Sequence, residues 1–102
     1  MQNHLRGSFS AINEYVSDNQ EGVLDTRVVV LKNDKSLLDD IFRVAITRSS
    51  NEYKVSIHWE DNGIENYKAL GLYGVYWASY VDMEYTSGCL EIYSDNLTIQ
   101  IY

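Results

Sequence analysis

Residues 89–102 read CLEIYSDNLTIQIY, and polar and apolar residues alternate on both sides of a turn in this stretch. Ser94, Asp95 and Asn96 are residue types that favour turns, so we expect the two flanking segments to pair as a β-hairpin. The alternation places five apolar side chains on one face: Leu90, Ile92, Leu97, Ile99 and Ile101. The opposite face would carry Glu91, Tyr93, Thr98, Gln100 and Tyr102.

The stretch before this hairpin also alternates with a period of two. Residues 69–80 could form a helix, but Gly71 and Gly74 would each cost about 1 kcal/mol relative to alanine in a helix interior. We therefore predict one long strand from Tyr73 that bends or bulges near the glycines. Its inward face would hold Tyr73, Val75, Trp77, Ser79, Val81, Met83 and Tyr85. Its outward face would hold Gly74, Tyr76, Ala78, Tyr80, Asp82 and Glu84.

The N-terminal part of the chain predicts a helix followed by a strand. Phe9, Ile12 and Val16 have the spacing of an amphipathic helix, with Ser8 as its N-cap and Gly22 just past its end. Residues 24–32 contain a β-branched run that favours a strand, and Asn33 and Asp34 would turn the chain.

The middle of the chain predicts a second hairpin. Ser36 and Asp39 resemble a capping box, so we expect one helical turn and then a strand over residues 41–48. Residues 49–51 supply turn chemistry, and the next strand points Tyr53, Val55, Ile57 and Trp59 inward and His58 outward. Residues 61–63 give a further turn signal.

These elements predict an α+β fold in which an antiparallel sheet of about five to six strands has an N-terminal helix packed on one face. The chain has 102 residues, no proline and no low-complexity tract, so we expect a single domain over residues 1–102. Cys89 has no disulfide partner and residues 1–10 lack the apolar core of a signal peptide. We expect a cytoplasmic protein.

Charge is distributed unevenly along the chain. The net charge is -7, yet residues 60–102 hold seven acids against one base, Lys68, together with seven of the nine tyrosines. Negative potential repels nucleic acid and anionic lipid, so direct binding of either is not expected. Carboxylates and tyrosines together suit a surface that binds a basic protein.

The predicted strand register gathers such residues on the side of the sheet away from the helix. The candidate partner-binding residues are Tyr76, Tyr80, Asp82, Glu84, Glu91, Tyr93, Asp95 and Tyr102. The competing interpretation is a solvated sheet surface whose tyrosines merely favour strands. Two other regions could also make the partner contact, namely the loop from Glu60 to Glu65 and an edge strand.

Catalytic and metal sites have weaker support. His58 could act as an acid or base, Cys89 as a nucleophile, and Asp82 with Glu84 as a glycosidase pair. However, the strand pattern points His58 outward beside Lys54, and no base lies near Cys89 in sequence. A short chain also seldom builds the deep cleft that a glycosidase needs. Two histidines and one cysteine do not form a zinc-binding pattern. We therefore expect a non-enzymatic protein without metal or cofactor.

In charge, size and aromatic content the chain resembles the broad class of small acidic inhibitors. This class includes immunity proteins that neutralise nuclease toxins and phage proteins that block nucleic-acid-binding host enzymes. The resemblance is compositional and implies an immunity protein against a basic bacterial toxin, with a phage inhibitor as the alternative. A third hypothesis is a structural homo-oligomer that pairs through a C-terminal edge strand, residues 97–102. A fourth hypothesis is a small-molecule binder or enzyme that uses His58 in a pocket near Trp59. We expect the protein to be a monomer or weak homodimer.

Overall fold

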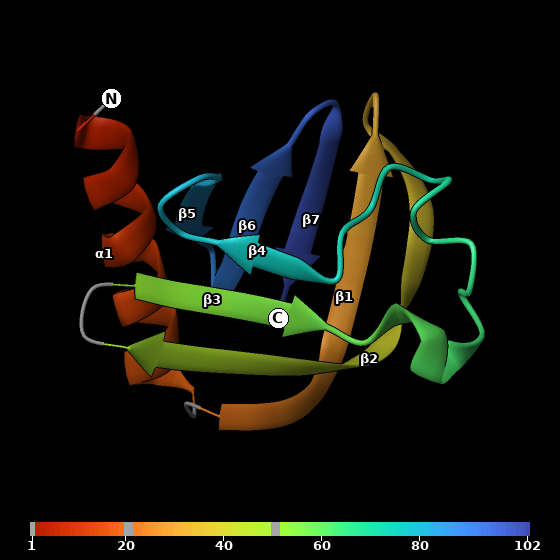
Figure 1. The fold of residues 1–102 in the computed structure, drawn as a ribbon, viewed down its shortest axis with the longest axis horizontal. Helices are drawn as coiled ribbons and strands as arrows, with labels where there is room; N and C mark the ends of the chain where they lie inside the picture. The colour runs from red at the N-terminus through yellow and green to blue at the C-terminus, as the bar shows by residue number, and fades with distance from the viewer. Residues whose placement is uncertain (1, 20–21, 50–51) are drawn as a thin grey trace.

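The computed structural model describes residues 2–19, 22–49 and 52–102, with side chains from Gly7 onward (Figure 1). Within these ranges the chain forms one α-helix, a short 3₁₀-helix and a seven-stranded antiparallel sheet. The elements are α1 (Gln2–Asp18), β1 (Gly22–Lys32), β2 (Lys35–Ser49), β3 (Glu52–Ile57), η1 (Trp59–Asn62), β4 (Val75–Trp77), β5 (Asp82–Thr86), β6 (Cys89–Ser94) and β7 (Leu97–Ile101). No described helix has the length and apolar character needed to cross a membrane.

The strands are ordered β4-β3-β2-β1-β7-β6-β5, and the sheet curls strongly. Figure 1 shows β2, β3 and β4 running across the direction of β1, β7 and β6, with α1 standing at the side. The α+β class and the N-terminal helix are therefore confirmed, but the sheet has seven strands rather than five or six. In addition, β7 lies between β1 and β6. The predicted C-terminal edge strand is thus an internal strand, because both of its sides are already paired.

The additional strand arises because the predicted long strand breaks into β4 and β5. The backbone N–H groups of Tyr80 and Val81 both donate to the carbonyl of Trp77, at 3.0 and 3.1 Å, which turns the chain between the two strands. A turn interrupts the period of two, so the inward residues are even-numbered in β4 and odd-numbered in β5. Tyr76 is consequently buried and Trp77 is 41% exposed, the reverse of the prediction, whereas Met83 points inward as expected.

The other strand predictions hold, with one exception. The β1–β2 hairpin turns at Asn33 and Asp34, which both have positive φ, and the β6–β7 hairpin has the predicted register. The predicted helical turn at residues 36–39 is wrong, because this part of β2 pairs with β1 as a strand. The carboxylate of Asp39 binds the guanidinium of Arg27 across the two strands instead of capping a helix. The predicted turn residues Ser50 and Asn51 lie outside the described residues.

The helix α1 begins before Ser8, so Ser8 is a buried residue within it and not the predicted N-cap. Its hydroxyl donates to the carbonyl of Val81 at 2.8 Å and accepts from the N–H of Met83 at 3.1 Å. These two groups belong to the edge formed by β5, beyond which no other strand of the described residues pairs. The Ser8 side chain therefore supplies hydrogen bonds that a neighbouring strand would otherwise make along part of that edge.

The core lies between the curled sheet and α1. From the helix it contains Ile12 and Tyr15, and from the loop side Trp59, whose indole N–H donates to the carbonyl of Tyr73 at 2.8 Å. The predicted inward residues Tyr53, Val55, Ile57 and Trp59 are all buried, and His58 is exposed as expected. The apolar face of the β6–β7 hairpin completes this core.

We expect Ser8→Ala to lower the free energy of unfolding by about 1–3 kcal/mol, because it leaves the Val81 carbonyl and the Met83 N–H without their partner in a buried place. Urea denaturation monitored by circular dichroism would measure this. Ser10→Ala is the matched control, since Ser10 is exposed on the same helix and its loss should change stability little. Equal stability of the two variants would contradict the role of Ser8.

We also expect stability to fall at alkaline pH. Burial raises the pKa of Tyr15 and of Tyr76 to about 12 in each case. Both phenols lose their protons more easily in the unfolded chain than in the folded protein. Their contribution to the free energy of unfolding is therefore complete below about pH 10 and is lost as the pH rises towards 12. In this alkaline range the free energy of unfolding, measured with urea, should change less steeply with pH in Tyr15→Phe than in the wild type. The difference in slope should correspond to about one proton. An unchanged slope would show that Tyr15 ionises normally.

Candidate functional site

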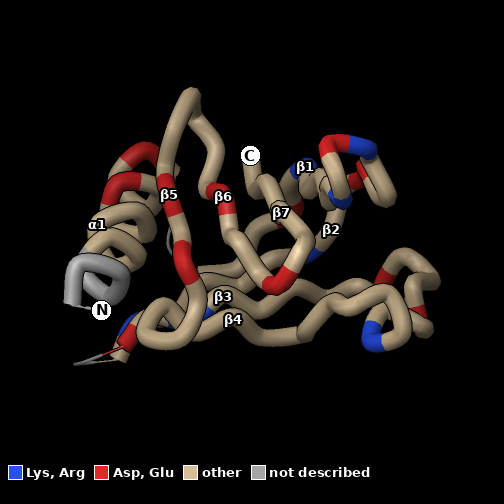
Figure 2. The backbone as a smooth tube through the Cα atoms, turned by 90° about the horizontal axis from the view of Figure 1, so that it is seen from above, with Lys and Arg blue, Asp and Glu red and all other residues tan. Residues whose placement is uncertain are grey.

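The outer side of β5 and β6 brings together four of the predicted partner-binding residues. Asp82 and Glu84 are exposed on β5, and Glu91 and Tyr93 are half-buried on β6. The register sets Asp82 opposite Tyr93 and Glu84 opposite Glu91. Figure 2 shows the acidic positions of these two neighbouring strands. We call this set (Asp82, Glu84, Glu91 and Tyr93) the acidic face.

Hydrogen bonds hold one carboxylate of the acidic face more firmly than the other. The Tyr93 hydroxyl lies 2.6 Å from Glu91 Oε1 and 3.3 Å from Glu84 Oε1, and it has a single proton to donate. The other oxygen of Glu91 accepts from the side-chain amide of Gln100 at 2.9 Å. Glu91 is therefore fixed by two donors, whereas among the described side chains Glu84 has only the longer contact and retains acceptor capacity toward solvent.

The electrostatics of this pair are unfavourable in the isolated protein. Glu84 and Glu91 are directly opposite one another on paired strands, an arrangement that destabilises a sheet when both carry the same charge. Within the described part of the chain, the arginine–carboxylate ion pairs are Arg27 with Asp39 and Arg43 with Asp25, both between β1 and β2. Burial, followed by the hydrogen bond to Glu91, raises the pKa of Tyr93, so its hydroxyl remains a donor.

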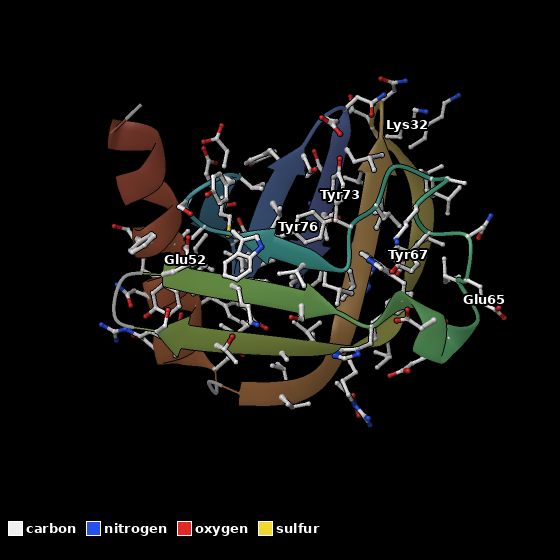
Figure 3. All side chains as sticks on the ribbon, viewed as in Figure 1. Lys32, Glu52, Glu65, Tyr67, Tyr73 and Tyr76 are labelled. Atoms are coloured by element: carbon white, nitrogen blue, oxygen red, sulfur yellow. The ribbon has the colours of Figure 1, made fainter. Side chains whose placement is uncertain are left out.

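Tyr76 does not belong to this surface, which corrects its prediction as a binding residue exposed on the sheet. It is 1% exposed and faces the core from β4. Its hydroxyl accepts the backbone N–H of Tyr73 at 2.9 Å, and the two rings pack edge to face (Figure 3). The reason is the turn between β4 and β5, which reverses the alternation. Tyr80, in that turn, is 79% exposed and lies two residues before Asp82.

The remaining two predicted residues are not among the four that form the acidic face. Asp95 is exposed in the turn between β6 and β7. Tyr102 is partly exposed, and the guanidinium of Arg27 lies 5.2 Å from the centre of its ring. That arginine also binds Asp39, so Tyr102 borders a mixed-charge region of the molecule.

Of the residues considered for catalysis, Asp82 and Glu84 share the outer side of β5, whereas His58 directly precedes η1 and Cys89 begins β6. Cys89 is buried, and burial, assisted by the charge of Glu91, raises the pKa of its thiol, which keeps it protonated and weakly nucleophilic. Among the described residues, no group of three or more His, Cys, Asp or Glu side chains could hold a metal ion.

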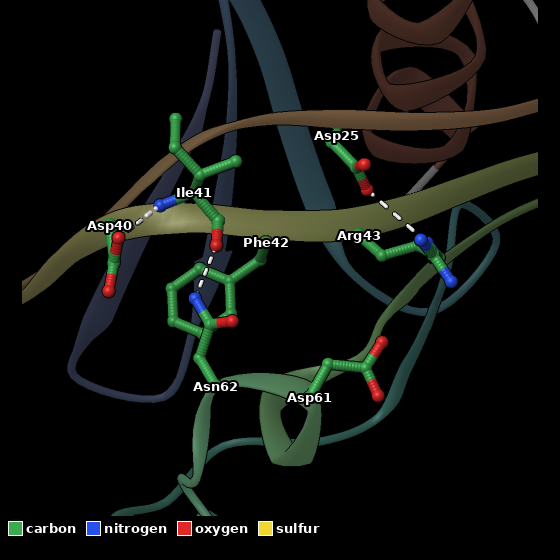
Figure 4. A pocket seen from close by; sticks show the side chains of 7 residues that line it. All are labelled: Asp25, Asp40, Ile41, Phe42, Arg43, Asp61 and Asn62. Carbon is green, nitrogen blue, oxygen red and sulfur yellow. Dashed lines mark hydrogen bonds and ion pairs between the residues drawn. The ribbon is translucent and has the colours of Figure 1, made fainter.

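A separate hollow of about 740 Å³ lies where β1 and β2 meet η1 (Figure 4). Its lining combines acids, one base and apolar groups: Asp25, Asp40, Ile41, Phe42, Arg43, Asp61 and Asn62. The Arg43 guanidinium lies 3.3 Å from Asp25, and the Asn62 amide donates to the carbonyl of Ile41. The sequence pattern does not reveal this hollow, because its residues come from three separate segments of the chain. Phe42 also packs on Trp59, so the hollow lies near Trp59, where a binder or enzyme that uses His58 would have its pocket.

Comparisons of the chain with models of protein families, with curated proteins and with solved structures found no match.

We expect Glu91→Gln to lower the pKa of Tyr93 toward the ordinary phenol value of about 10, because a charged acceptor holds the phenol proton more strongly than an amide does. Glu84→Gln should lower it less, since the Glu84 contact is longer. Resonances of the tyrosine ring carbons, followed by NMR as a function of pH, would measure both shifts. A larger change in the pKa of Tyr93 in Glu84→Gln than in Glu91→Gln would show that the Tyr93 hydroxyl bonds chiefly to Glu84.

Proposed function

We propose that this protein is a non-enzymatic inhibitor that binds a basic protein through the acidic face. The observation that carries the proposal is the directly opposed pair of Glu84 and Glu91, without a described lysine or arginine bound to either. A cation from a partner would relieve the repulsion between the two carboxylates and would gain charge-assisted hydrogen bonds with them. The pair thus has more to gain from a basic partner than an ordinary solvated surface does.

The arrangement of the face suits recognition of arginine or lysine. Glu91 is held in place by Tyr93 and Gln100, so little side-chain freedom is lost when a partner binds to it. Glu84 offers the more open carboxylate. The ring of Tyr80 supplies exposed aromatic area two residues from Asp82, and a tyrosine of this kind often anchors a protein interface.

The net charge of the chain favours a strongly basic partner such as a nuclease. Long-range attraction would raise the association rate by about 10- to 1000-fold at low salt. A row of carboxylates could then occupy the cleft where the partner binds nucleic-acid phosphates. An immunity protein that neutralises a bacterial nuclease toxin fits this description best, and a phage inhibitor of a host nucleic-acid-binding enzyme is the alternative.

The double variant Glu84→Gln with Glu91→Gln should slow association with the basic partner about tenfold or more at low salt and flatten its salt dependence. The partner is obtained by capture from the native lysate at low salt and elution with rising salt. Binding kinetics are then measured by surface plasmon resonance, and the captured protein is assayed for nuclease activity with and without this chain.

The matched control is Glu60→Gln with Glu65→Gln, which changes the net charge by the same amount at two exposed positions far from β5 and β6 in sequence. It should alter the association rate much less. Equal effects of the two double variants would show that the overall charge, and not the acidic face, sets the association rate. A larger effect of the control would show that the partner contacts the loop from Glu60 to Glu65 instead.

A further inference from the structure

A groove lies between α1 and β5, next to the acidic face. Its volume of about 240 Å³ suits a single long side chain, because drug-sized ligands occupy pockets of roughly 300–1,000 Å³. It is lined by Gly7, Ser10, Ala11 and Glu14 of the helix and by Met83, Glu84, Tyr85 and Thr86 of the strand. Three of the four helix residues are small, which leaves room beside the strand. Glu84 also belongs to the acidic face, so the groove and the face are continuous.

The strand side of the groove presents backbone groups that lack a partner. Ser8 bonds to the carbonyl of Val81 and the N–H of Met83, so these two residues direct their backbone groups away from β6. Backbone direction alternates along an antiparallel strand, and therefore the carbonyl of Met83 and both backbone groups of Tyr85 point the same way. About one turn after Ser8 the helix offers Ala11, which has no hydroxyl to repeat the Ser8 contact. Among the described residues, no group outside the sheet bonds to this second set.

Carboxylates border the groove on both sides. Glu14 lies on α1 and Glu84 on β5, and both are exposed. Figure 2 shows acidic positions on the helix as well as on β5. Of the described residues, no lysine or arginine lines the groove or forms an ion pair with either acid. Asp18, also on α1, already accepts a hydrogen bond from the Tyr85 hydroxyl at 2.6 Å, so it is not counted among the open acceptors.

The chemistry of the groove favours a cation that carries several hydrogen-bond donors on an apolar stem. Apart from the hydroxyls of Ser10 and Thr86, its open groups are the two carboxylates and the carbonyls of Met83 and Tyr85, against the single N–H of Tyr85. Arginine matches this set, because its guanidinium has five donors in a planar fork and no acceptor. Its aliphatic stem can lie on the apolar surface of Ala11 and Met83. Lysine, a compact charge with three donors, matches fewer of these acceptors.

We propose that the groove between α1 and β5 receives one arginine side chain of the basic partner. This inference rests on the proposed function, since it names the residue with which that partner is anchored beside the acidic face. The guanidinium bridges Glu14 and Glu84 and donates to the carbonyl of Met83, while the stem covers Ala11. An anchor held in a preformed groove acts mainly by slowing dissociation of the complex.

Titration of the isotope-labelled full chain with acetyl-arginine amide, followed by NMR at constant ionic strength, tests the groove without a partner. The backbone amide resonances of Ala11 and Tyr85 should shift and saturate in the millimolar range. The neutral analogue acetyl-citrulline amide should shift them much less, because it lacks the charge. Ser10→Leu should abolish the shifts, since the leucine fills the groove without changing the net charge. Ser17→Leu is the matched control, because Ser17 is exposed on the same helix and does not line the groove.

The captured partner provides the second test, by surface plasmon resonance. Ser10→Leu and Glu14→Gln should each raise the dissociation rate by at least about tenfold, whereas Ser17→Leu and Glu60→Gln should leave it unchanged. Circular dichroism establishes that each variant is folded.

Equal shifts with the two amides, or shifts that persist in Ser10→Leu, overturn the proposal. So does a dissociation rate that is unchanged in both Ser10→Leu and Glu14→Gln. If Glu84→Gln with Glu91→Gln still slows association in that case, the acidic face keeps its proposed function without the groove. If the double variant associates like the wild type, the proposed function fails, and saturable shifts with acetyl-arginine amide would still support the groove as an arginine site.

Discussion

The double pairing of β1 is the constraint on which the rest of the structure depends. Over its whole length β1 pairs with β2, and over Val28–Lys32 it also pairs with β7. Val28, Val29 and Val30 are all buried, so this run is covered on both faces as in the interior of a sheet. It joins the half of the sheet that carries β3 and β4 to the half that carries β6 and β5. The register shift after Val30 falls within this junction, where extra twist helps the sheet to curl.

From this junction the candidate site follows by simple alternation. Along β6, Leu90 and Ile92 enter the core while Glu91 and Tyr93 face outward. The same strand therefore contributes apolar burial on one side and negative potential on the other. Burial of the inner row supplies the free energy that allows two like charges to remain opposed on the outer row, since each apolar side chain contributes about 1.5–3 kcal/mol when fully buried and the repulsion costs less than that.

The sequence predicted the hairpins and the core residues where alternation continues unbroken, as in β3 and in β6 with β7. It failed where a turn lies inside an apparently continuous pattern. Nothing in the order of residues 73–85 marks the change of phase after Trp77, because that turn is made by backbone bonds between non-glycine residues. Glu84, Glu91 and Tyr93 were placed correctly because β5 and β6 keep their phase, whereas Tyr76 was misplaced. Ser36 and Asp39 carry a local capping signal, but the long ladder with β1 outweighs it. Ser8 was misassigned because its partners are distant in sequence.

The distance of those partners bears on how the protein is made. The bonds of Ser8 join residues 73 and 75 positions apart, and the hydroxyl of Tyr15 donates to the carbonyl of Tyr102, 87 positions away. During synthesis on the ribosome, α1 emerges before the strands yet must wait for β5 and β6 before it has a surface to pack on. Contacts of such long range slow folding, since the loop must close before any of them forms. Until then the nascent helix exposes Ile12 and Tyr15 to water, and apolar surface that stays exposed in this way favours aggregation over folding.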